Sequence, residues 1–272
     1  MKSIDNLTIL VTGSTDGIGM LTATQLAKLG ANVIVHGRNS QKLTRAMNSI
    51  KTESGNSNIE GYIADFNALN NVRELASKVL NNHPKLDVLI NNAGIGLTGE
   101  RKVSQDGYEL RFAVNYLAPF LLTHLLIPAL KKRAPSRIVN VASIGQHPIN
   151  FKDVMLEKKF DPHQAYRQSK LALIMFTFTM AEEINNFDIT INSMHPGTYL
   201  DTKMVREAGI TPMGRAESGA DAEVYLATSP DLNEVSGQYF DVMRKSKAIK
   251  QAYDVEARKK LWSLSMNLTG LQ

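Results

Sequence analysis

The chain opens with a strand, a glycine-rich turn and a helix, in that order. Residues 7–11 form a short apolar run, residues 12–19 read TGSTDGIG, and an apolar-periodic run continues from Met20 to Leu29. A buried strand that turns through glycines into a helix begins a βαβ unit that binds a dinucleotide. The free N–H groups and the positive dipole end of such a helix face a pyrophosphate. This opening predicts an α/β fold with a nucleotide site at its first turn.

The three glycines of this turn have separate expected tasks. Gly13 permits the tight turn, Gly17 lets the backbone approach a pyrophosphate, and Gly19 allows the helix to pack against the strand. Their spacing is G-x-x-x-G-x-G, not G-x-G-x-x-G, and a merely flexible turn is the alternative. The position directly after the first strand favours nucleotide binding. The residues expected at the phosphates are Gly13, Ser14, Thr15, Asp16, Gly17, Ile18 and Gly19.

Strands and helices alternate along the whole chain. Apolar runs typical of parallel strands buried on both faces occupy 7–11, 32–36, 59–63, 86–90, 137–142 and 188–193. Helical patterns occupy 18–29, 40–53, 68–82, 104–130, 163–186 and 217–228. With a last short strand near 238–243, the pattern predicts a Rossmann fold: a doubly wound parallel sheet of seven strands between two helical layers. We expect one domain over 1–272.

Two irregular segments, 144–162 and 197–216, follow the carboxyl ends of predicted strands. An open α/β sheet binds its ligands at that edge, so we expect these segments to form the substrate loops and a lid. A helical tail is expected over about 245–272. Within it Val255, Leu261, Leu264 and Leu268 lie near one helical face, which must be buried against something. Packing on the chain's own body is one reading; closure over 197–216 or contact with a second subunit is the other.

Composition excludes several kinds of site. The chain has no cysteine, so it has no disulfide, thiol nucleophile or thiolate metal site. The histidines form no H-E-x-x-H motif, and no metal site is expected. The net charge of +5 comes without aromatic interleaving or a groove-reading motif. It indicates a solvated surface that attracts an anionic cofactor, not a nucleic-acid binder.

The beginning of the chain bears on its location. The first strand starts within seven residues, which leaves no room for a signal peptide. We expect no apolar run long enough to span a bilayer. These observations predict a cytoplasmic protein with no membrane anchor.

Three residues in the second half suggest proton chemistry. Tyr166 and Lys170 are four residues apart in a helical pattern, so their side chains project from one face. Ser143 ends an apolar strand. A cation beside a tyrosine stabilises the phenolate and lowers a pKa that is otherwise about 10. Tyr166 is therefore expected to exchange protons near neutral pH, as a carbonyl/alcohol interconversion requires.

Together, these motifs resemble the short-chain dehydrogenase/reductase family. TGSTDGIG, Asn91-Asn92-Ala93-Gly94, Asn115, Ser143, Tyr166-x-x-x-Lys170 and Pro196-Gly197 occur in the family's order over residues 12–202. The segment from Ser143 to Lys170 and the tail around Leu261-Trp262 are most similar to the retinol-dehydrogenase-like and protochlorophyllide-reductase-like branch.

The resemblance implies a role for each matching residue. Ser143 would bind the substrate oxygen, Tyr166 would transfer the proton, and Lys170 would depress the pKa of Tyr166 and hold the nicotinamide ribose. Asn115 would position a water linked to the lysine, or is simply satisfied inside a helix. Further cofactor contacts are implied for Asp65 with Phe66 at the adenine, Asn91 near the adenosine ribose, Pro196, Gly197 and Thr198 at the carboxamide, and Thr202 at the pyrophosphate or amide.

The end of the second strand predicts which cofactor binds. An acidic residue there would bind the ribose 2′-hydroxyl of NAD, whereas an arginine can pair with the 2′-phosphate of NADP. The sequence has Arg38 and Asn39 and no acid at this point, which favours NADP(H). A surface arginine without a ligand is the alternative.

The sequence thus predicts an NADP(H)-dependent oxidoreductase that interconverts a carbonyl and an alcohol on a small apolar molecule. A non-catalytic NADP(H)-binding regulator on the same fold is the alternative, and an epimerase or dehydratase is a third. Retinoid, steroid, aromatic ketone and quinone-like substrates stay open, as do monomer and homo-oligomer. Apolar residues of the loops could wall the pocket or pack the loops to the body: Phe151, Val154, Met155, Leu156, Phe160, Met204, Val205, Ile210 and Met213.

Overall fold

The structure, a computed structural model, describes residues 3–271. Within these residues eight strands form one sheet in the order β3-β2-β1-β4-β5-β6-β7-β8. The strands are β1 Thr8–Val11, β2 Asn32–Gly37, β3 Ile59–Ile63, β4 Val88–Asn91, β5 Ser136–Val141, β6 Ile189–His195, β7 Tyr239–Asp241 and β8 Arg244–Ser246. The first seven run parallel, which confirms the predicted sheet.

The eighth strand was not predicted. β8 pairs antiparallel with β7 through a two-residue connection, Val242-Met243. Hairpin connections of this length usually carry glycine or asparagine because their backbone needs a positive φ. Here Val242 takes φ 56°, so the residue that signals such a turn is absent from the sequence.

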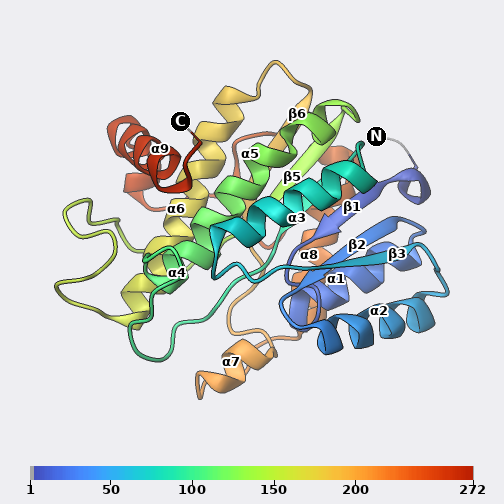
Figure 1. Cartoon of the computed structure of the whole chain (residues 1–272), viewed down its shortest axis with the longest axis horizontal. Coiled ribbons are helices and arrows are strands. Elements are labelled where there is room, and N and C mark those ends of the chain that lie inside the picture. Colours follow the sequence, from blue (N-terminus) through green and yellow to red (C-terminus); the bar gives the residue numbers. More distant parts are fainter. Residues whose placement is uncertain (1–2, 272) are drawn as a thin grey trace.

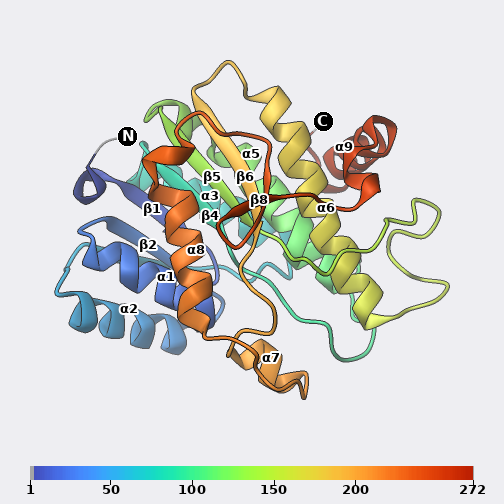
Figure 2. The same ribbon diagram turned by 180° about the vertical axis from the view of Figure 1, so that it is seen from behind.

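Helices cover both faces of the sheet. They are α1 Gly17–Lys28, α2 Ser40–Ser54, α3 Leu69–Asn82, α4 Leu110–Phe112, α5 Ala118–Lys131, α6 Pro162–Glu183, α7 Lys203–Glu207, α8 Ala216–Thr228 and α9 Val255–Thr269. α3, α5 and α6 lie on the face toward the viewer in Figure 1, and α1, α2 and α8 lie on the face seen in Figure 2. Each face buries its own apolar cluster against the strands. The predicted three-layer α/β/α architecture is confirmed.

The winding of the sheet reverses between β1 and β4. β1 pairs with β2 on one side and with β4 on the other, and the chain reaches β4 only after β2 and β3. Loops leave the carboxyl ends of adjacent strands in opposite directions at such a point and open a crevice. The glycine turn after β1 and residues 92–94 after β4 therefore border the same crevice.

The segment predicted as one helix over 104–130 is interrupted. A π-helical turn, Ala113–Leu117, separates α4 from α5 and has Asn115 at its centre. The combined 22-residue segment Leu110–Lys131 is long and apolar enough to cross a membrane, so our expectation that no such run exists is wrong. Its most apolar stretch is 78% buried inside the fold, as in a core helix. The cytoplasmic location stays a prediction.

The C-terminal helix packs on the chain's own body. Trp262 lies against the rings of Phe120 and Phe176 at 5.4 and 6.2 Å between centroids, and Tyr116 hydrogen-bonds Ser265 at 2.5 Å. The buried face of α9 is formed by Ala257, Leu261, Ser265 and Thr269. Val255, which we placed on that face, is 50% exposed. Local packing is therefore the reading that the structure supports.

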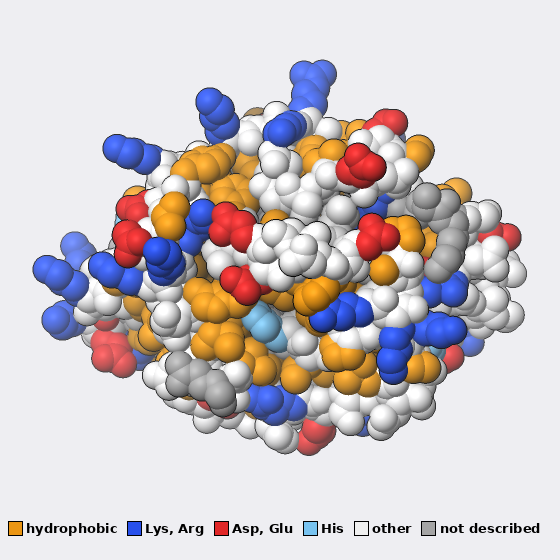
Figure 3. All heavy atoms as spheres, turned by 90° about the horizontal axis from the view of Figure 1, so that it is seen from above, with side chains coloured by type: hydrophobic (Ala, Val, Ile, Leu, Met, Phe, Trp, Pro, Cys, Tyr) orange, Lys and Arg blue, Asp and Glu red, His pale blue; other side chains and the backbone are white. Residues whose placement is uncertain are grey.

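The surface is mixed in charge. Figure 3 shows the side of the molecule opposite α7, where Lys and Arg side chains project from the edge, several of them together at the left, and acidic side chains lie among them. Such a distribution agrees with solvated charges on this side.

Candidate active site

Ser143, Tyr166 and Lys170 converge at the carboxyl edge of the sheet. Ser143 follows β5 by two residues, and α6 carries the other two side chains on one face. Ser143 is the polar neighbour that lowers the pKa of the Tyr166 hydroxyl. The Lys170 Nζ donates to the carbonyl oxygen of Val141 at 2.7 Å and lies 5.8 Å from the centre of the Tyr166 ring. The structure thus brings together the three groups that the sequence singled out.

The electrostatics of this cluster differ from the expectation. Burial raises the pKa of Tyr166, and the hydrogen bond with Ser143 opposes that shift only in part. We expected Lys170 to lower this pKa, but in the structure its ammonium is bonded to the backbone of β5. Burial lowers the pKa of Lys170 itself to about 8, opposed by the field of Glu223.

Asn115 is tied to the loop after β4. Its Oδ1 accepts from the Ile95 N–H at 2.8 Å, and its Nδ2 donates to the Ile95 carbonyl at 3.1 Å and to Ser169 Oγ at 3.0 Å. A Cβ added at Gly94 would lie 3.3 Å from Asn115 Oδ1 and 3.5 Å from Lys170 Nζ. Asn115 therefore lies beside the lysine, but its side chain is already fully engaged. π-turns such as the one around it are frequent at functional sites.

The glycine turn is held against the loop after β4. Thr12 Oγ1 accepts from the N–H groups of Asn92 and Ala93 at 3.0 Å, and Asn92 Nδ2 donates to the carbonyls of Thr12 and Gly13. A Cβ on Gly19 would lie 2.2 Å from Asn92 Nδ2. Position 19 must therefore be glycine mainly because the Asn92 amide, more than the strand, fills the space that a side chain would need. The free end of α1 is capped by Asp16, whose carboxylate accepts from the Gly17 N–H at 2.8 Å.

Ser14 is buried beneath the turn. Its Oγ donates to the Val11 carbonyl at 2.8 Å and accepts from the His36 N–H at 2.9 Å. Its side chain is therefore committed to the fold, and any contact with a phosphate would come from its backbone.

The end of β2 presents Arg38 beside the turn. Thr15 packs on Gly37, where an added Cβ would lie 2.4 Å from Thr15 Cγ2. The Arg38 side chain is exposed, whereas Asn39 caps α2 by accepting from the Lys42 N–H at 3.0 Å. Arg38 is therefore available to an anion at the glycine turn, and the Asn39 side chain already has a local partner.

Two predicted cofactor residues have their side chains engaged elsewhere. Phe66 is buried and stacks on His36, with centroids 4.4 Å apart. Asn91 Nδ2 donates to Thr123 Oγ1 at 3.1 Å and to Asn140 Oδ1 at 2.8 Å. Contacts to an adenosine from Phe66 and Asn91 would have to come from their backbone. Asp65, next to Phe66, is only partly buried and accepts from the Asn67 N–H at 3.0 Å.

The segment after β6 lies across the start of α1. Thr198 Oγ1 is 3.1 Å from His195 Nε2, and Gly197 follows Pro196 with φ 136°. Thr202 caps α7 and is in contact range of Gly17, where an added Cβ would lie 3.7 Å from its Cγ2. The structure thus places Thr202 next to the turn expected to bind phosphates.

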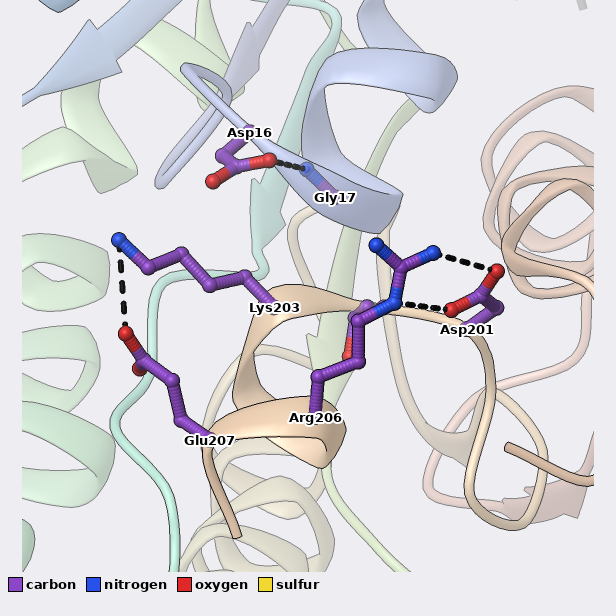
Figure 4. Close-up of a pocket in the computed structure, with 7 residues that line it drawn as sticks. Asp16, Gly17, Asp201, Lys203, Arg206 and Glu207 are labelled. Atoms are coloured by element: carbon purple, nitrogen blue, oxygen red, sulfur yellow. Dashed lines mark hydrogen bonds and ion pairs between the residues drawn. The ribbon is translucent and has the colours of Figure 1, made fainter. Parts of the chain in front are cut away.

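A cavity of about 500 Å³ separates α7 from the first turn of α1. Figure 4 shows Arg206 rising from α7 toward Gly17 while it holds Asp201 at 2.7 and 2.8 Å. Lys203 lies on the other side and pairs with Glu207 at 3.5 Å. This cavity is at the phosphate end of the crevice, and its two cations were not singled out from the sequence.

The loop residues proposed as a pocket wall divide into two groups. Val154 and Leu156 are buried in the core, and Phe151 and Met155 pack against it. Met204 and Met213 are 39% and 75% exposed. Met204 also reaches the loop after β4, because a Cβ on Gly96 would lie 2.8 Å from its Cγ. Packing of the first loop to the body is therefore observed, and α7 with its flanks presents the apolar surface.

Two buried groups near the site were missed. His36 accepts from the Gly13 N–H through Nδ1 at 3.1 Å, and its Nε2 lies 3.0 Å from the Ala64 carbonyl. Glu223 on α8 is fully buried, accepts from Thr22 Oγ1 at 2.9 Å and has no partner for Oε1 among the described residues. His36 could have been singled out from the sequence, because it directly precedes Gly37 and Arg38 at the end of the second strand. Glu223 could not, because a single Glu in a helical pattern does not indicate that its side chain is buried.

Comparisons with known proteins agree with this geometry. Residues 7–212 match the family model described as short chain dehydrogenase. Human retinol dehydrogenase 13 is 35% identical over 288 residues, which cover 99% of this chain and 86% of that protein. A crystal structure of an uncharacterized protein from Mycobacterium paratuberculosis superposes with a TM-score of 0.82 at 28% identity, covering 99% and 96% of the two chains.

A short chain dehydrogenase from Shigella flexneri solved with NADP superposes with a TM-score of 0.69 at 28% identity, covering 87% of this chain and 97% of that one. The chain therefore belongs to the short-chain dehydrogenase/reductase family, in its retinol-dehydrogenase-like branch.

Proposed function

We propose that this protein is an NADP(H)-dependent oxidoreductase that interconverts the carbonyl and alcohol forms of a small apolar molecule. The observation that carries the proposal is the convergence of Ser143, Tyr166 and the buried Lys170 ammonium at the carboxyl edge of the sheet. A carbonyl oxygen that gains a proton is stabilised by a hydroxyl that donates a hydrogen bond, by an acid that gives the proton and by a nearby cation.

The residues present suit a phosphorylated dinucleotide. The first turn of α1 faces a cavity with two cations, and Arg38 is exposed at the end of β2. Arg38 and the backbone of residues 13–19 would hold the phosphates, and Lys170 would hold the ribose next to the nicotinamide. Asp65 would contact the adenine and the backbone of residues 196–198 the carboxamide. When bound, the nicotinamide supplies or accepts the hydride. The relative from Shigella flexneri solved with NADP supports this choice of cofactor.

The protein's own residues manage the proton. Ser143 would donate to the substrate oxygen and orient it toward Tyr166. Tyr166 would give its hydroxyl proton to that oxygen in reduction, or take it back in oxidation. Because burial raises the pKa of Tyr166, the phenol is the resting form, which suits the reductive direction. Asn115 would hold the loop after β4 in contact with Lys170.

The mouth of the site favours an apolar substrate. Ile144, Tyr199, Met204 and Met213 are at least 39% exposed on the two segments that flank the Ser143–Tyr166 pair. Flexible methionines adapt to irregular apolar ligands. The relative named retinol dehydrogenase, which acts on an apolar alcohol, supports the same class.

A panel of aldehydes, ketones and alcohols of rising chain length, tested with NADPH, NADH and the oxidised cofactors, checks the proposal. We expect NADPH oxidation with apolar aldehydes or ketones and a preference over NADH of at least about tenfold, the worth of one charged hydrogen bond. NADPH binding without turnover of any compound would contradict the proposal and favour a regulatory binding protein.

A further inference from the structure

His36 is buried at the edge of the sheet where the loops after β1, β2 and β3 begin. It lies in β2, its Nδ1 faces the Gly13 N–H of the glycine turn at 3.1 Å, and its Nε2 faces the Ala64 carbonyl after β3 at 3.0 Å. His36 is 3% exposed, and its ring stacks on Phe66. Its backbone also exchanges two hydrogen bonds with Ser14, each of 2.9 Å.

These partners determine the state of the ring. A backbone N–H can only donate and a carbonyl can only accept, so Nδ1 must be the bare nitrogen and Nε2 must carry the proton. A charged imidazolium would turn an N–H toward the part-buried Gly13 N–H, and one of these two donors would lose its acceptor. Only the neutral ring fits between the two loops.

We propose that neutral His36 is a positioning residue of the cofactor site, which fixes the glycine turn relative to the adenine-facing Asp65. Gly13 begins the turn that meets the phosphates, and Ala64 directly precedes Asp65. The ring joins them across the end of β2, two residues before Arg38. The inference rests on the proposed function, because it concerns the same NADP(H) site. Protonation of this ring would therefore release the cofactor in acid.

The surroundings of the ring agree with this. Burial lowers the pKa of His36 to about 4, while the Ala64 carbonyl and the charge of Asp65 oppose the shift. The other charged side chain at this strand end, Arg38, is exposed.

Two variants separate the contacts of His36, and a third serves as their control. Phe keeps a ring to stack on Phe66 but offers no acceptor to the Gly13 N–H. Asn carries its amide oxygen near the position of Nδ1, so it preserves that acceptor and does not titrate. The exposed His163 provides the matched control, His163→Asn.

The experiment is calorimetric titration of each folded variant with NADP⁺ and with NAD⁺ between pH 4 and 8, with thermal melting measured at every pH. NAD⁺ lacks the 2′-phosphate, so acid titration of that phosphate cannot affect it. We expect His36→Phe to bind at least about tenfold more weakly than wild type at pH 7, because the part-buried Gly13 N–H loses its acceptor. His36→Asn keeps the acceptor for the Gly13 N–H but loses the bond to the Ala64 carbonyl, so it should bind more tightly than His36→Phe and more weakly than wild type. It should also lack the weakening that wild type shows with both cofactors toward pH 4.

Wild-type affinity in His36→Phe, or an unchanged pH profile in His36→Asn, would overturn the proposal. Melting shifts with unchanged dissociation constants would reduce His36 to a structural residue. If wild type bound neither cofactor, the proposed function would fail instead.

Discussion

Lys170 donates a 2.7 Å hydrogen bond to the carbonyl oxygen of Val141, the residue that ends β5. Ser143 follows two residues later, so the ammonium is fixed to the same strand end that delivers the serine. The cation therefore belongs to the backbone framework of the site more than to the Tyr166 phenol, and Tyr166 is left with Ser143 as its polar partner.

Lys170→Met should impair function and stabilise the fold. We expect turnover to fall about a hundredfold or more and NADPH to bind more weakly. Burial lowers the pKa of Lys170 from 10.5 to about 8. Below pH 8 the buried charge therefore destabilises the wild-type fold, and this destabilisation fades as the pH rises toward 10.5. The variant should melt at a higher temperature than wild type at pH 7, with the difference shrinking above pH 8. Equal melting temperatures at pH 7 would show that the charge is not penalised.

Glu223→Gln should stabilise the protein at alkaline pH. Burial raises the pKa of Glu223 from 4.5 to about 8, so stability from this group is fully present below pH 4.5 and is lost as the pH rises through 8. The amide cannot ionise, and the gain in melting temperature should be larger at pH 8.5 than at pH 5. The exposed Glu183→Gln is the control. The variant should also lower the pKa of Lys170, since the field of Glu223 raises it. A gain that does not vary with pH would contradict this account.

Arg38→Asp should reverse the cofactor preference. The exposed guanidinium is the group we assign to the 2′-phosphate, and an acid there would repel that phosphate and accept from a ribose hydroxyl. NADPH should bind about tenfold to a hundredfold more weakly, while NADH is spared or improved. Fluorescence titration of both cofactors is the measurement, with the exposed Lys85→Asp, ahead of β4, as the control. An unchanged preference would mean that another residue reads the phosphate.

The charge of Arg206 on α7 should strengthen the binding of both cofactors to a similar extent. Arg206 faces the cavity at the first turn of α1 but is held by Asp201. Arg206→Gln should weaken NADPH and NADH by similar factors and flatten the dependence of affinity on salt. Asp201→Asn should tighten both a few-fold, because it frees the guanidinium. Dissociation constants measured over a salt series test this. No change in either variant would leave Arg206 as a surface ion pair.

Most of the fold could be predicted because its signals are local. Glycines after an apolar strand and regular alternation of strands and helices fix the doubly wound sheet. β8 could not be predicted because Val242 occupies the left-handed turn position. The break at Asn115 was also missed, although Pro119, two residues after the π-turn at Ala113–Leu117, has no N–H to donate to the Asn115 carbonyl and was an available signal.

The site was predictable in its residues but less so in its contacts. Ser143, Tyr166 and Lys170 meet as expected because strand ends and i, i+4 spacing decide their positions. The partner of Lys170 is a backbone carbonyl, and the partners of His36 and Glu223 come from distant segments. Such contacts depend on packing across the sheet, which no local pattern encodes.

The most direct test of the central claim is turnover in purified Tyr166→Phe. The variant removes one hydroxyl and leaves Lys170 and the glycine turn in place. If Tyr166 transfers the proton, turnover of an apolar carbonyl with NADPH should fall at least about a hundredfold, while the dissociation constant for NADPH stays within a few-fold of wild type. Turnover near the wild-type value would contradict the account.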